Sequence, residues 1–416
     1  MLDWTRLDNA AKIFPSAPRR GDTQVFRFSC ELTTPVIPAL LQRAAEDTLA
    51  RFPTYRYGLR RGFFWYYLEE TRLRPVVREE KGTICAPLYQ KRRPGLLFSV
   101  SYYGCRINLE LFHVLADGTG GLRFLQALVL RYLALKEKKE FAPGDYDASF
   151  AQQEEDSFSQ YYGLKSREKT EPQPRAVKLR GKRLPHSQLQ LILGRCSASA
   201  VSALAKENGG TVGAFLCAAL IEAVLAEVPV RDRKRPVSIC VPVNLRRYFP
   251  SGSARNFFYN IHVHGDFSGM PFFQRVLLCQ QQMKERITPE KLTAGMNGFG
   301  KVERNPLIRL VPLGIKDRVL HLAFDAESKK DTAGLSNIGR ITMPPQARPF
   351  VRGFDFCAAT DSLQVCVASF EDTMSISFLS PFRETEIPRR FFRRLCENGV
   401  EVCIESNTIW EGGKTP

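Results

Sequence analysis

The chain has 416 residues, which is longer than one typical domain and suggests two or three, each able to bury its own core. A hydrophobic fraction of 44% and a charged fraction of 25% exclude a disordered or fibrous protein. The formal net charge of +17 favours anionic partners such as phosphorylated cofactors. No zinc-finger, RNP or helix-turn-helix signature accompanies this charge, so we expect no nucleic-acid partner.

The distribution of cysteines and the hydropathy of the chain indicate the cellular compartment. The eleven cysteines are scattered, with no C-x-x-C and no tight cluster, which is typical of thiols in a reducing compartment and favours a cytoplasmic protein. The first residues, "MLDWTRLDNAAKIF", carry charges where a signal peptide needs an apolar core. The most apolar run, "AFLCAALIEAVLA" at 214–226, is too short for a transmembrane segment and predicts a buried helix.

The first part of the chain alternates strand and helix patterns, as layered α/β domains do. Its predicted elements are strands over 23–32, 62–70 and 96–114, the last a hairpin that turns at 103–105, and helices over 34–52 and 119–139. Residues 137–185 break this alternation with acidic and basic runs and turn-forming residues. We interpret residues 166–185 as a basic crossover linker, either solvated or in contact with phosphate.

The linker divides the chain into an N-terminal half, residues 1–165, and a C-terminal half, residues 186–416. The second half again mixes sheet and helix, and no short repeat period indicates a solenoid. Its predicted elements are helices over 197–207, 211–228 and 389–399 and strands over 235–243, 256–267, 363–370, 373–380 and 400–406. The fold class expected is therefore α/β with mixed sheets.

The stretch "ELFHVLADGTGG" places a histidine at the end of a predicted strand and an aspartate and glycine at the start of a predicted helix. Strand alternation puts His113 on the inward face with Ile107, Leu109 and Leu111. A histidine there can act as a base near neutral pH, or it can be a satisfied histidine of the core. H-x-x-x-D-G is expected on the order of 0.01 times by chance in a chain of this composition.

"HVLADG" resembles the H-x-x-x-D-G signature of the CoA-dependent acyltransferase superfamily, which includes chloramphenicol acetyltransferase and the condensation domains of peptide synthetases. Other segments match in order: "RFPTYRYGL" at 51–59, "VPVNLRRYF" at 241–249, "NFFYN" at 256–260 and "LSNIGRITMP" at 335–344. The chain looks most like the bacterial alcohol acetyltransferase branch. The motif departs from many relatives in carrying Phe112 where they have a first histidine.

The resemblance implies two similar chloramphenicol acetyltransferase-like halves that face each other, with an active-site tunnel between them. It implies that His113 is the general base and that no acyl-enzyme forms. It implies that Asp117 and Gly118 are structural, with Asp117 held by an arginine, for which Arg56 is the candidate by position.

Four further residues are candidates for the site. Ser336 and Asn337 could supply oxyanion donors or shape the tunnel, or be plain turn residues. Asn244 and Arg246 lie in the second-half motif, where a structural role at a strand end is the alternative. His262 and His264 alternate on one strand, as zinc ligands can, but only Asp266 stands nearby as a third ligand, so we expect no metal site.

The resemblance implies an acyltransferase that moves an acyl group from acyl-CoA, its co-substrate, to an alcohol. The basic run "RDRKR" at 231–235 could contact the CoA phosphates, or be a solvated loop. The alternatives are an amide-forming condensation enzyme that uses a carrier-protein thioester and an amine, and a non-catalytic member. No tightly bound cofactor is expected, and a monomer is compatible with the sequence.

Overall fold

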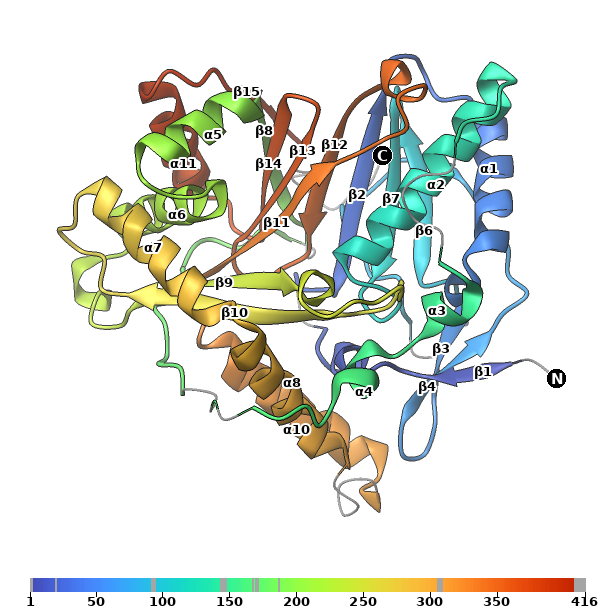
Figure 1. The fold of residues 1–416 in the computed structure, drawn as a ribbon, viewed down its shortest axis with the longest axis horizontal. Helices are drawn as coiled ribbons and strands as arrows, with labels where there is room; N and C mark the ends of the chain where they lie inside the picture. Colours follow the sequence, from blue (N-terminus) through green and yellow to red (C-terminus); the bar gives the residue numbers. More distant parts are fainter. Residues whose placement is uncertain are drawn as a thin grey trace.

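The structure is a computed structural model that describes residues 3–18, 21–90, 95–142, 148–166, 168, 172–185, 188–304 and 310–407. Three β-sheets organise this part of the chain (Figure 1). The five-stranded sheet has the order β12-β2-β7-β6-β5, the seven-stranded sheet has the order β10-β9-β11-β13-β14-β8-β15, and a small sheet has the order β1-β4-β3.

We call the five-stranded sheet with α1 and α2 the N-terminal lobe. Its strands are β2 (Val25–Leu32), β5 (Arg78–Glu79), β6 (Phe98–Tyr103), β7 (Arg106–Phe112) and β12 (Val351–Ala358), and its helices are α1 (Pro38–Arg51) and α2 (Gly118–Glu137). The helices lie side by side on the outer face of the sheet (Figure 1). Gly104, at a φ of 55°, makes the tight turn between β6 and β7, as the sequence predicted.

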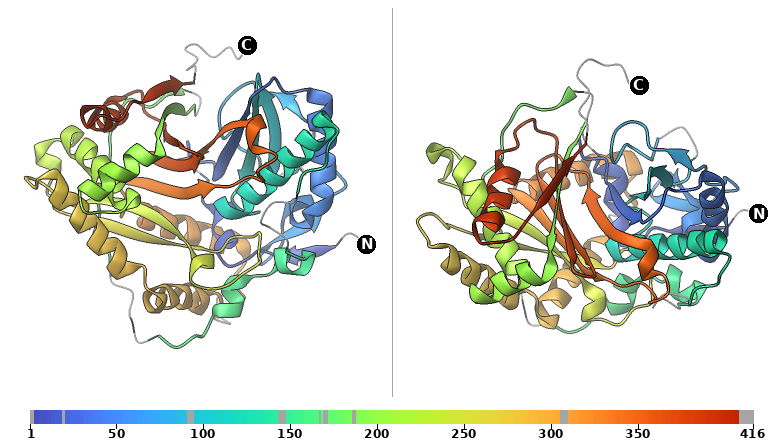
Figure 2. Two further views of the ribbon diagram at one scale, coloured as in Figure 1. Left: turned by 45° about the horizontal axis from the view of Figure 1, so that its top comes forward. Right: turned by 90° about the horizontal axis from the view of Figure 1, so that it is seen from above.

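We call the seven-stranded sheet and its helices the C-terminal lobe. Its strands are β8 (Gln190–Ser197), β9 (Val237–Asn244), β10 (Phe258–Gly265), β11 (Ala333–Ile341), β13 (Gln364–Phe370), β14 (Thr373–Ser380) and β15 (Cys403–Ser406). Its helices are α5 (Ala198–Glu207), α6 (Val212–Glu227), α7 (Phe272–Arg286) and α11 (Glu386–Glu397). They cover the face of the sheet that is turned away from the N-terminal lobe (Figures 1 and 2).

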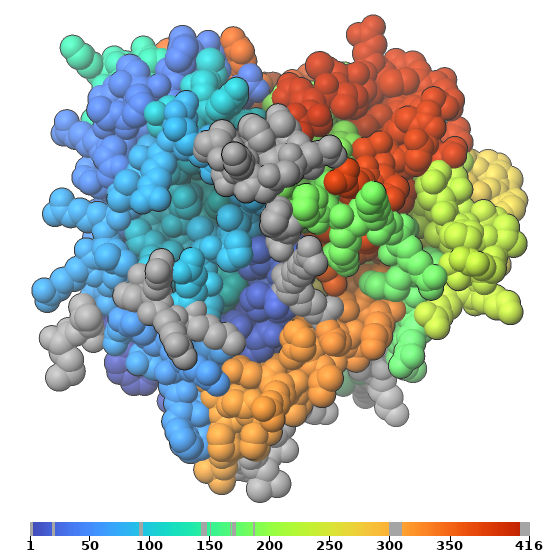
Figure 3. Space-filling model, turned by 180° about the vertical axis from the view of Figure 1, so that it is seen from behind, coloured from blue at the N-terminus to red at the C-terminus, as the bar shows by residue number. Residues whose placement is uncertain are grey.

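Smaller elements fill the lower edge of the molecule in Figure 1. They are β1 (Trp4–Arg6), β3 (Tyr57–Arg61), β4 (Tyr66–Glu70), α3 (Phe150–Glu154), α4 (Ser157–Tyr161), α8 (Pro289–Arg304) and α10 (Leu313–Ser328). Seen from behind, early and late residues form the two sides of the surface, and the segment around α10 lies below them (Figure 3).

One strand departs from the order of the chain. β12 follows β11 in sequence, but it pairs antiparallel with β2 and so completes the sheet of the N-terminal lobe. The ring of Phe356 on β12 stacks on Phe28 of β2 at 4.5 Å between centroids. Asp355 on the same strand accepts from Arg195 and Ser375 of the C-terminal lobe, both at 2.8 Å. β12 therefore connects the two lobes. The predicted domain boundaries, 1–165 and 186–416, stay a prediction.

β13 separates the two largest hydrophobic cores of the described residues. Cys366 and Ala368 pack into the core of the N-terminal lobe, whereas Val365 and Val367 pack into that of the C-terminal lobe. Successive side chains of a strand point to opposite faces, so a strand buried on both faces serves both cores and carries an almost continuous apolar sequence. The apolar run that predicted a buried helix is α6, and it lies in the second core.

The sequence patterns missed several elements. Strands β3, β8 and β12 and helices α7, α8 and α10 were not predicted, and the strand expected at 62–70 begins only at Tyr66. β8 and β12 interrupt their apolar residues with polar ones that are paired in the structure, such as Arg195 and Asp355, so their strand pattern is weak.

Among the described residues, no single helix has both the length and the apolar composition needed to cross a bilayer. α5 and α6 reach this length and apolar composition only when taken together, and the two helices are bent by 81° relative to each other.

Candidate active site

His113 lies directly after β7, at a pocket of about 670 Å³ between the lobes. Residues of both lobes line the pocket, including Phe26 and Asp117 from the N-terminal lobe and Val243 and Ser336 from the C-terminal lobe. The backbone N–H of His113 donates to the carbonyl of Gln24 at 2.8 Å, which fixes the chain where the strand ends. The inward orientation predicted from strand alternation therefore brings the ring to a cavity.

The hydrogen bonds of Asn256 define the tautomer of His113. The amide nitrogen of Asn256 faces two acceptors, the His113 carbonyl at 2.9 Å and the Asp8 carboxylate at 3.2 Å. The amide oxygen therefore faces Nδ1 of His113, at 2.9 Å, and must accept a proton from it. In the neutral ring, Nε2 then carries the lone pair, and it makes no hydrogen bond within the described residues.

Apolar surroundings keep the His113 imidazole neutral. Phe14 stacks on the ring at 4.5 Å between centroids, and Phe26 and Phe258 lie at 5.1 and 5.4 Å. Burial lowers the pKa of His113 more than the nearby Asp117 carboxylate raises it, so the net shift is downward. A neutral histidine with an unoccupied nitrogen lone pair at a pocket is equipped to accept a proton.

Asp8 supports Asn256 from the other side. Its carboxylate is fully buried, accepts from the backbone N–H of Ala11 at 2.7 Å, and lies 3.6 Å from the Arg255 guanidinium. Burial raises the pKa of Asp8 to about 6, while Arg255 opposes the shift. A buried chain of contacts thus runs from His113 through Asn256 and Asp8 to Arg255.

The arginine that holds Asp117 is Arg246, which corrects the expectation that it is Arg56. Nη1 of Arg246 lies 2.6 Å from Oδ2 of Asp117, and both side chains are buried. In the segment before β3, Tyr55 takes the inward position, and its hydroxyl donates to the Gly120 carbonyl at 3.1 Å. Arg56 is only half-buried, and its side chain makes no hydrogen bond or ion pair with the described residues.

Asp117 braces the start of α2. Its Oδ1 accepts from the backbone N–H of Gly120 at 3.0 Å and caps the helix, while Oδ2 accepts from the backbone N–H of Phe257 at 2.8 Å. Burial by itself raises the pKa of this carboxyl, but the Arg246 guanidinium and the hydrogen bonds outweigh it and hold the pKa below its usual value. Asp117 is therefore an ionised structural group that joins the two lobes.

Gly118 lies close to the C-terminal lobe, and its backbone conformation is an ordinary one. Its φ lies outside the left-handed region, and an added Cβ would meet only the terminal Cδ1 of Ile338, at 2.8 Å. Gly120 is more constrained, because its Cβ would lie 1.9 Å from the Ala254 carbonyl oxygen. Gly120, the first glycine after the motif, therefore sets how closely the lobes approach.

The second-half motif meets the histidine motif directly. Asn244, at the end of β9, donates to the Thr119 hydroxyl at 3.0 Å. Arg246 also donates to the carbonyls of Ser253 and Arg255, at 3.0 and 2.5 Å. These contacts support the structural alternative for both predicted residues.

Ser336 and Asn337 line the pocket from β11. The Asn337 side chain accepts from the Gly339 N–H at 2.8 Å, across an irregularity in the strand, and so shapes the backbone. The Ser336 hydroxyl makes no hydrogen bond within the described part of the chain, which leaves it available to a ligand.

Sequence reasoning missed two functional residues, Asn256 and Asp8. Asn256 begins the "NFFYN" segment that matched the family pattern, so this match was the signal that could have identified it. Asp8 stands in the N-terminal segment without any motif around it. Only the packing of that segment beside His113 reveals its role.

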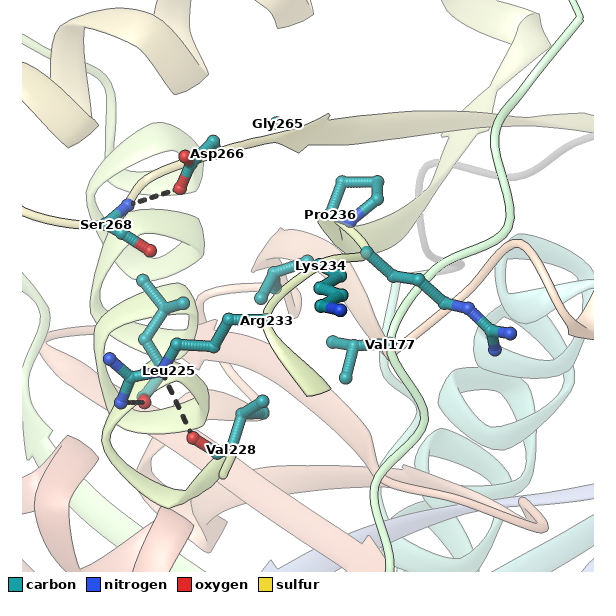
Figure 4. A pocket seen from close by; sticks show the side chains of 11 residues that line it. Val177, Leu225, Val228, Arg233, Lys234, Pro236, Gly265, Asp266 and Ser268 are labelled. Carbon is teal, nitrogen blue, oxygen red and sulfur yellow. Dashed lines mark hydrogen bonds between the residues drawn. The ribbon is translucent and has the colours of Figure 1, made fainter. Parts of the chain in front are cut away.

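The basic run at 231–235 borders a separate, smaller pocket of about 180 Å³ (Figure 4). Arg233 turns its guanidinium onto the end of α6 and donates to the carbonyls of Leu225 and Val228, at 2.9 and 3.2 Å. No described residue lines both this pocket and the pocket of His113. Two cationic side chains of the described residues line the His113 pocket. Lys178 donates to the backbone carbonyls of Ser328 and Asp331, whereas Arg247 is exposed.

No family model matches the sequence, and no curated protein matches it. Solved structures do match. A complex of F. sporotrichioides TRI101 with coenzyme A and T-2 is 11% identical over 96% of this chain and 99% of that chain, with a TM-score of 0.65. The first condensation domain of the calcium-dependent antibiotic synthetase is 16% identical over 95% and 96%, with a TM-score of 0.60.

A third similar structure is polyketide synthase associated protein 5 from Mycobacterium tuberculosis, which is 15% identical over 94% of this chain and 97% of that chain, with a TM-score of 0.59. At identities this low, the similarity concerns the fold alone. The coverage shows that the shared fold extends over almost the whole of each chain. The chain therefore shares the two-lobed fold of the TRI101 and condensation-domain structures, as the resemblance of its motifs implied.

Proposed function

We propose that the protein is an acyltransferase that moves an acyl group from acyl-CoA to the hydroxyl of an alcohol, with His113 as the general base. The observation that carries the proposal is the fixed tautomer of His113 at the pocket between the lobes. Nδ1 is bound by Asn256, so the basic Nε2 is left for the substrate.

The reaction needs one proton acceptor and no covalent enzyme intermediate. Nε2 of His113 takes the proton of the acceptor hydroxyl as its oxygen attacks the thioester carbonyl. The tetrahedral intermediate then collapses by breaking the bond between carbon and sulfur, and the imidazolium returns its proton to the departing CoA thiolate. The Ser336 hydroxyl, which lines the pocket, is the candidate donor to the oxyanion.

Features of the pocket support acyl-CoA as the donor. Its volume, about 670 Å³, is typical of a site for a small organic molecule. Exposed Arg247 at the pocket is able to pair with a phosphate, and so support for a phosphate contact comes from this residue more than from the run at 231–235. The similar TRI101 structure is a complex with coenzyme A.

A condensation-type enzyme is the second candidate. The similarity to the condensation domain of the antibiotic synthetase supports it, since such a domain has the same fold. It differs from the first candidate in its donor, a thioester on a carrier protein, and in its amine acceptor. The experiment below determines the acceptor and the chain length of the acyl group.

The test is the release of free CoA from short and long acyl-CoAs with alcohol and amine acceptors, beside a parallel series with acyl carrier protein. We expect turnover with an alcohol, and His113→Ala to lower kcat by roughly 10²–10⁴-fold. Acyl-CoA binding, measured by calorimetry, serves as the control and should persist in the variant. Unchanged turnover in His113→Ala would refute the general base, and binding without turnover for any acceptor would favour a non-catalytic member.

A further inference from the structure

Cys240, His262 and Asp331 form a cluster in the C-terminal lobe that the proposed reaction does not use. One potential ligand atom from each residue lies within 4.8 Å of the other two. Cys240 and Asp331 also line the pocket of His113, and His262 is buried behind them with 4% of its surface exposed. The three residues are 22 and 69 positions apart in the chain, so their spacing gives no metal motif.

The sheet places these side chains together. His262 on β10 is directly opposite Cys240 on β9 in the antiparallel ladder, so both side chains stand on the same face. Asp331 comes just before β11, whose Gly334 pairs with Cys240. Lys178 holds the backbone there by donating to the carbonyls of Ser328 and Asp331, both at 2.7 Å.

Two buried polar atoms of the cluster make no hydrogen bond within the described chain, although His262 and Asp331 lie within ion-pair distance. Nε2 of His262 lies 2.8 Å from Oδ1 of Asp331, yet Oδ1 accepts no hydrogen bond of acceptable geometry within the described chain. Nδ1 of His262 is also buried and makes none there. Buried polar atoms without partners carry a large free-energy cost, and a bound ion is one of the ways in which proteins offset it.

We propose that Cys240, His262 and Asp331 bind a zinc ion or another thiophilic divalent cation. A thiolate, an imidazole and a carboxylate are all zinc ligands. Tetrahedral zinc, with bonds of about 2.0–2.3 Å, separates its ligand atoms by roughly 3.3–3.6 Å, so small side-chain rotations bring the cluster into range. Binding releases the thiol proton of Cys240 to solvent.

Three protein ligands leave one coordination position of a tetrahedral ion open. Since Cys240 and Asp331 line the pocket, this position would face the space in which the proposed reaction takes place. The proposal is independent of the proposed acyl transfer, because its test measures metal binding and needs no turnover.

The experiment titrates chelator-treated full-length protein with zinc in competition with a chromophoric chelator. We expect one tightly bound equivalent, and Cys240→Ser and His262→Gln each to weaken it by about 100-fold or more. Cobalt(II) in place of zinc should give a charge-transfer band from thiolate to metal in the near ultraviolet, and Cys240→Ser should abolish that band.

Matched controls separate this site from adventitious binding by other residues. His264→Gln removes a histidine two positions along the same strand, and Cys396→Ser removes an exposed free thiol outside the cluster. Both should bind zinc as the wild type does. Absence of a tight equivalent in the wild type, or an affinity as high as that of the wild type in both Cys240→Ser and His262→Gln, would overturn the proposal. Asp331→Asn, which preserves shape, provides a third variant if either of the others fails to fold.

Discussion

At the scale of single residues, the site depends on how one imidazole is oriented. Strand alternation and the H-x-x-x-D-G spacing identified His113, but they left a base and a core histidine as alternatives. The structure adds two observations: Nδ1 of His113 is hydrogen-bonded to Asn256, and the imidazole ring lines a pocket. Both come from contacts between distant parts of the chain, and a pattern within one strand cannot contain them.

Asn256 is a positioning residue, and its substitution should affect the chemical step more than binding. Asn256→Ala removes the acceptor that selects the tautomer with a free Nε2. We expect kcat to fall by roughly tenfold or more, the equivalent of losing one hydrogen bond of about 1.4 kcal/mol, with KM for acyl-CoA unchanged. Steady-state kinetics measures both. The control is Asn297→Ala, a half-buried amide on α8 that hydrogen-bonds the backbone of residues 163 and 164 and does not line the pocket. A rise in KM alone would contradict the assignment.

The pH dependence of turnover should show the apolar setting of His113. The base acts in its neutral form, and burial lowers its pKa below the ordinary 6.5, so the neutral form persists to lower pH. Plots of kcat/KM against pH should therefore decline on the acid side only below pH 6.5. Phe14→Ala admits water to the ring and should move this limb to higher pH. A wild-type limb at or above 6.5 would be the contrary result.

At the scale of elements, the start of α2 is where the lobes meet. Asp117 caps the helix and binds Arg246, which in turn holds the segment before β10. The family resemblance predicted that an arginine holds Asp117, but position in the chain selected Arg56. Choosing the correct arginine requires knowing that the end of β9 packs against α2, which is a tertiary contact.

Two of the three glycines at the start of this helix, Gly118 and Gly120, provide a matched pair. Gly120→Ala places a methyl group 1.9 Å from the Ala254 carbonyl oxygen, which is backbone and can move only with its segment. We expect the free energy of unfolding to fall by about 3 kcal/mol or more. Gly118→Ala meets only the end of the Ile338 side chain and should cost about 1 kcal/mol or less. Denaturant titration of both variants measures the difference, and equal losses would contradict this account.

At the scale of the whole molecule, β12 links the two lobes. It closes the edge of the N-terminal sheet although it comes from the second half of the chain. Without it, β2 would expose a row of unpaired backbone groups, and Phe28 would lose its stacking partner.

A fragment of residues 1–165 should therefore not fold by itself. We expect it to bind hydrophobic dyes and to lack a cooperative thermal transition, whereas the full chain should unfold in a single transition. Calorimetry of both measures this. A fragment that unfolds cooperatively would show that the N-terminal sheet is stable without β12. The full-length protein, prepared in the same way, is the control.

The sequence by itself determined the fold class, the histidine and most helices and strands with strong periodicity, because alternation and helical spacing are local properties of the chain. It also determined the family likeness, through the motif spacing. Only the tertiary structure decided that Arg246 pairs with Asp117, that Asn256 and Asp8 orient His113, that β12 joins the first sheet, and that Cys240, His262 and Asp331 converge. Each of these depends on which distant segments pack together, and that choice is made by the burial of the whole chain.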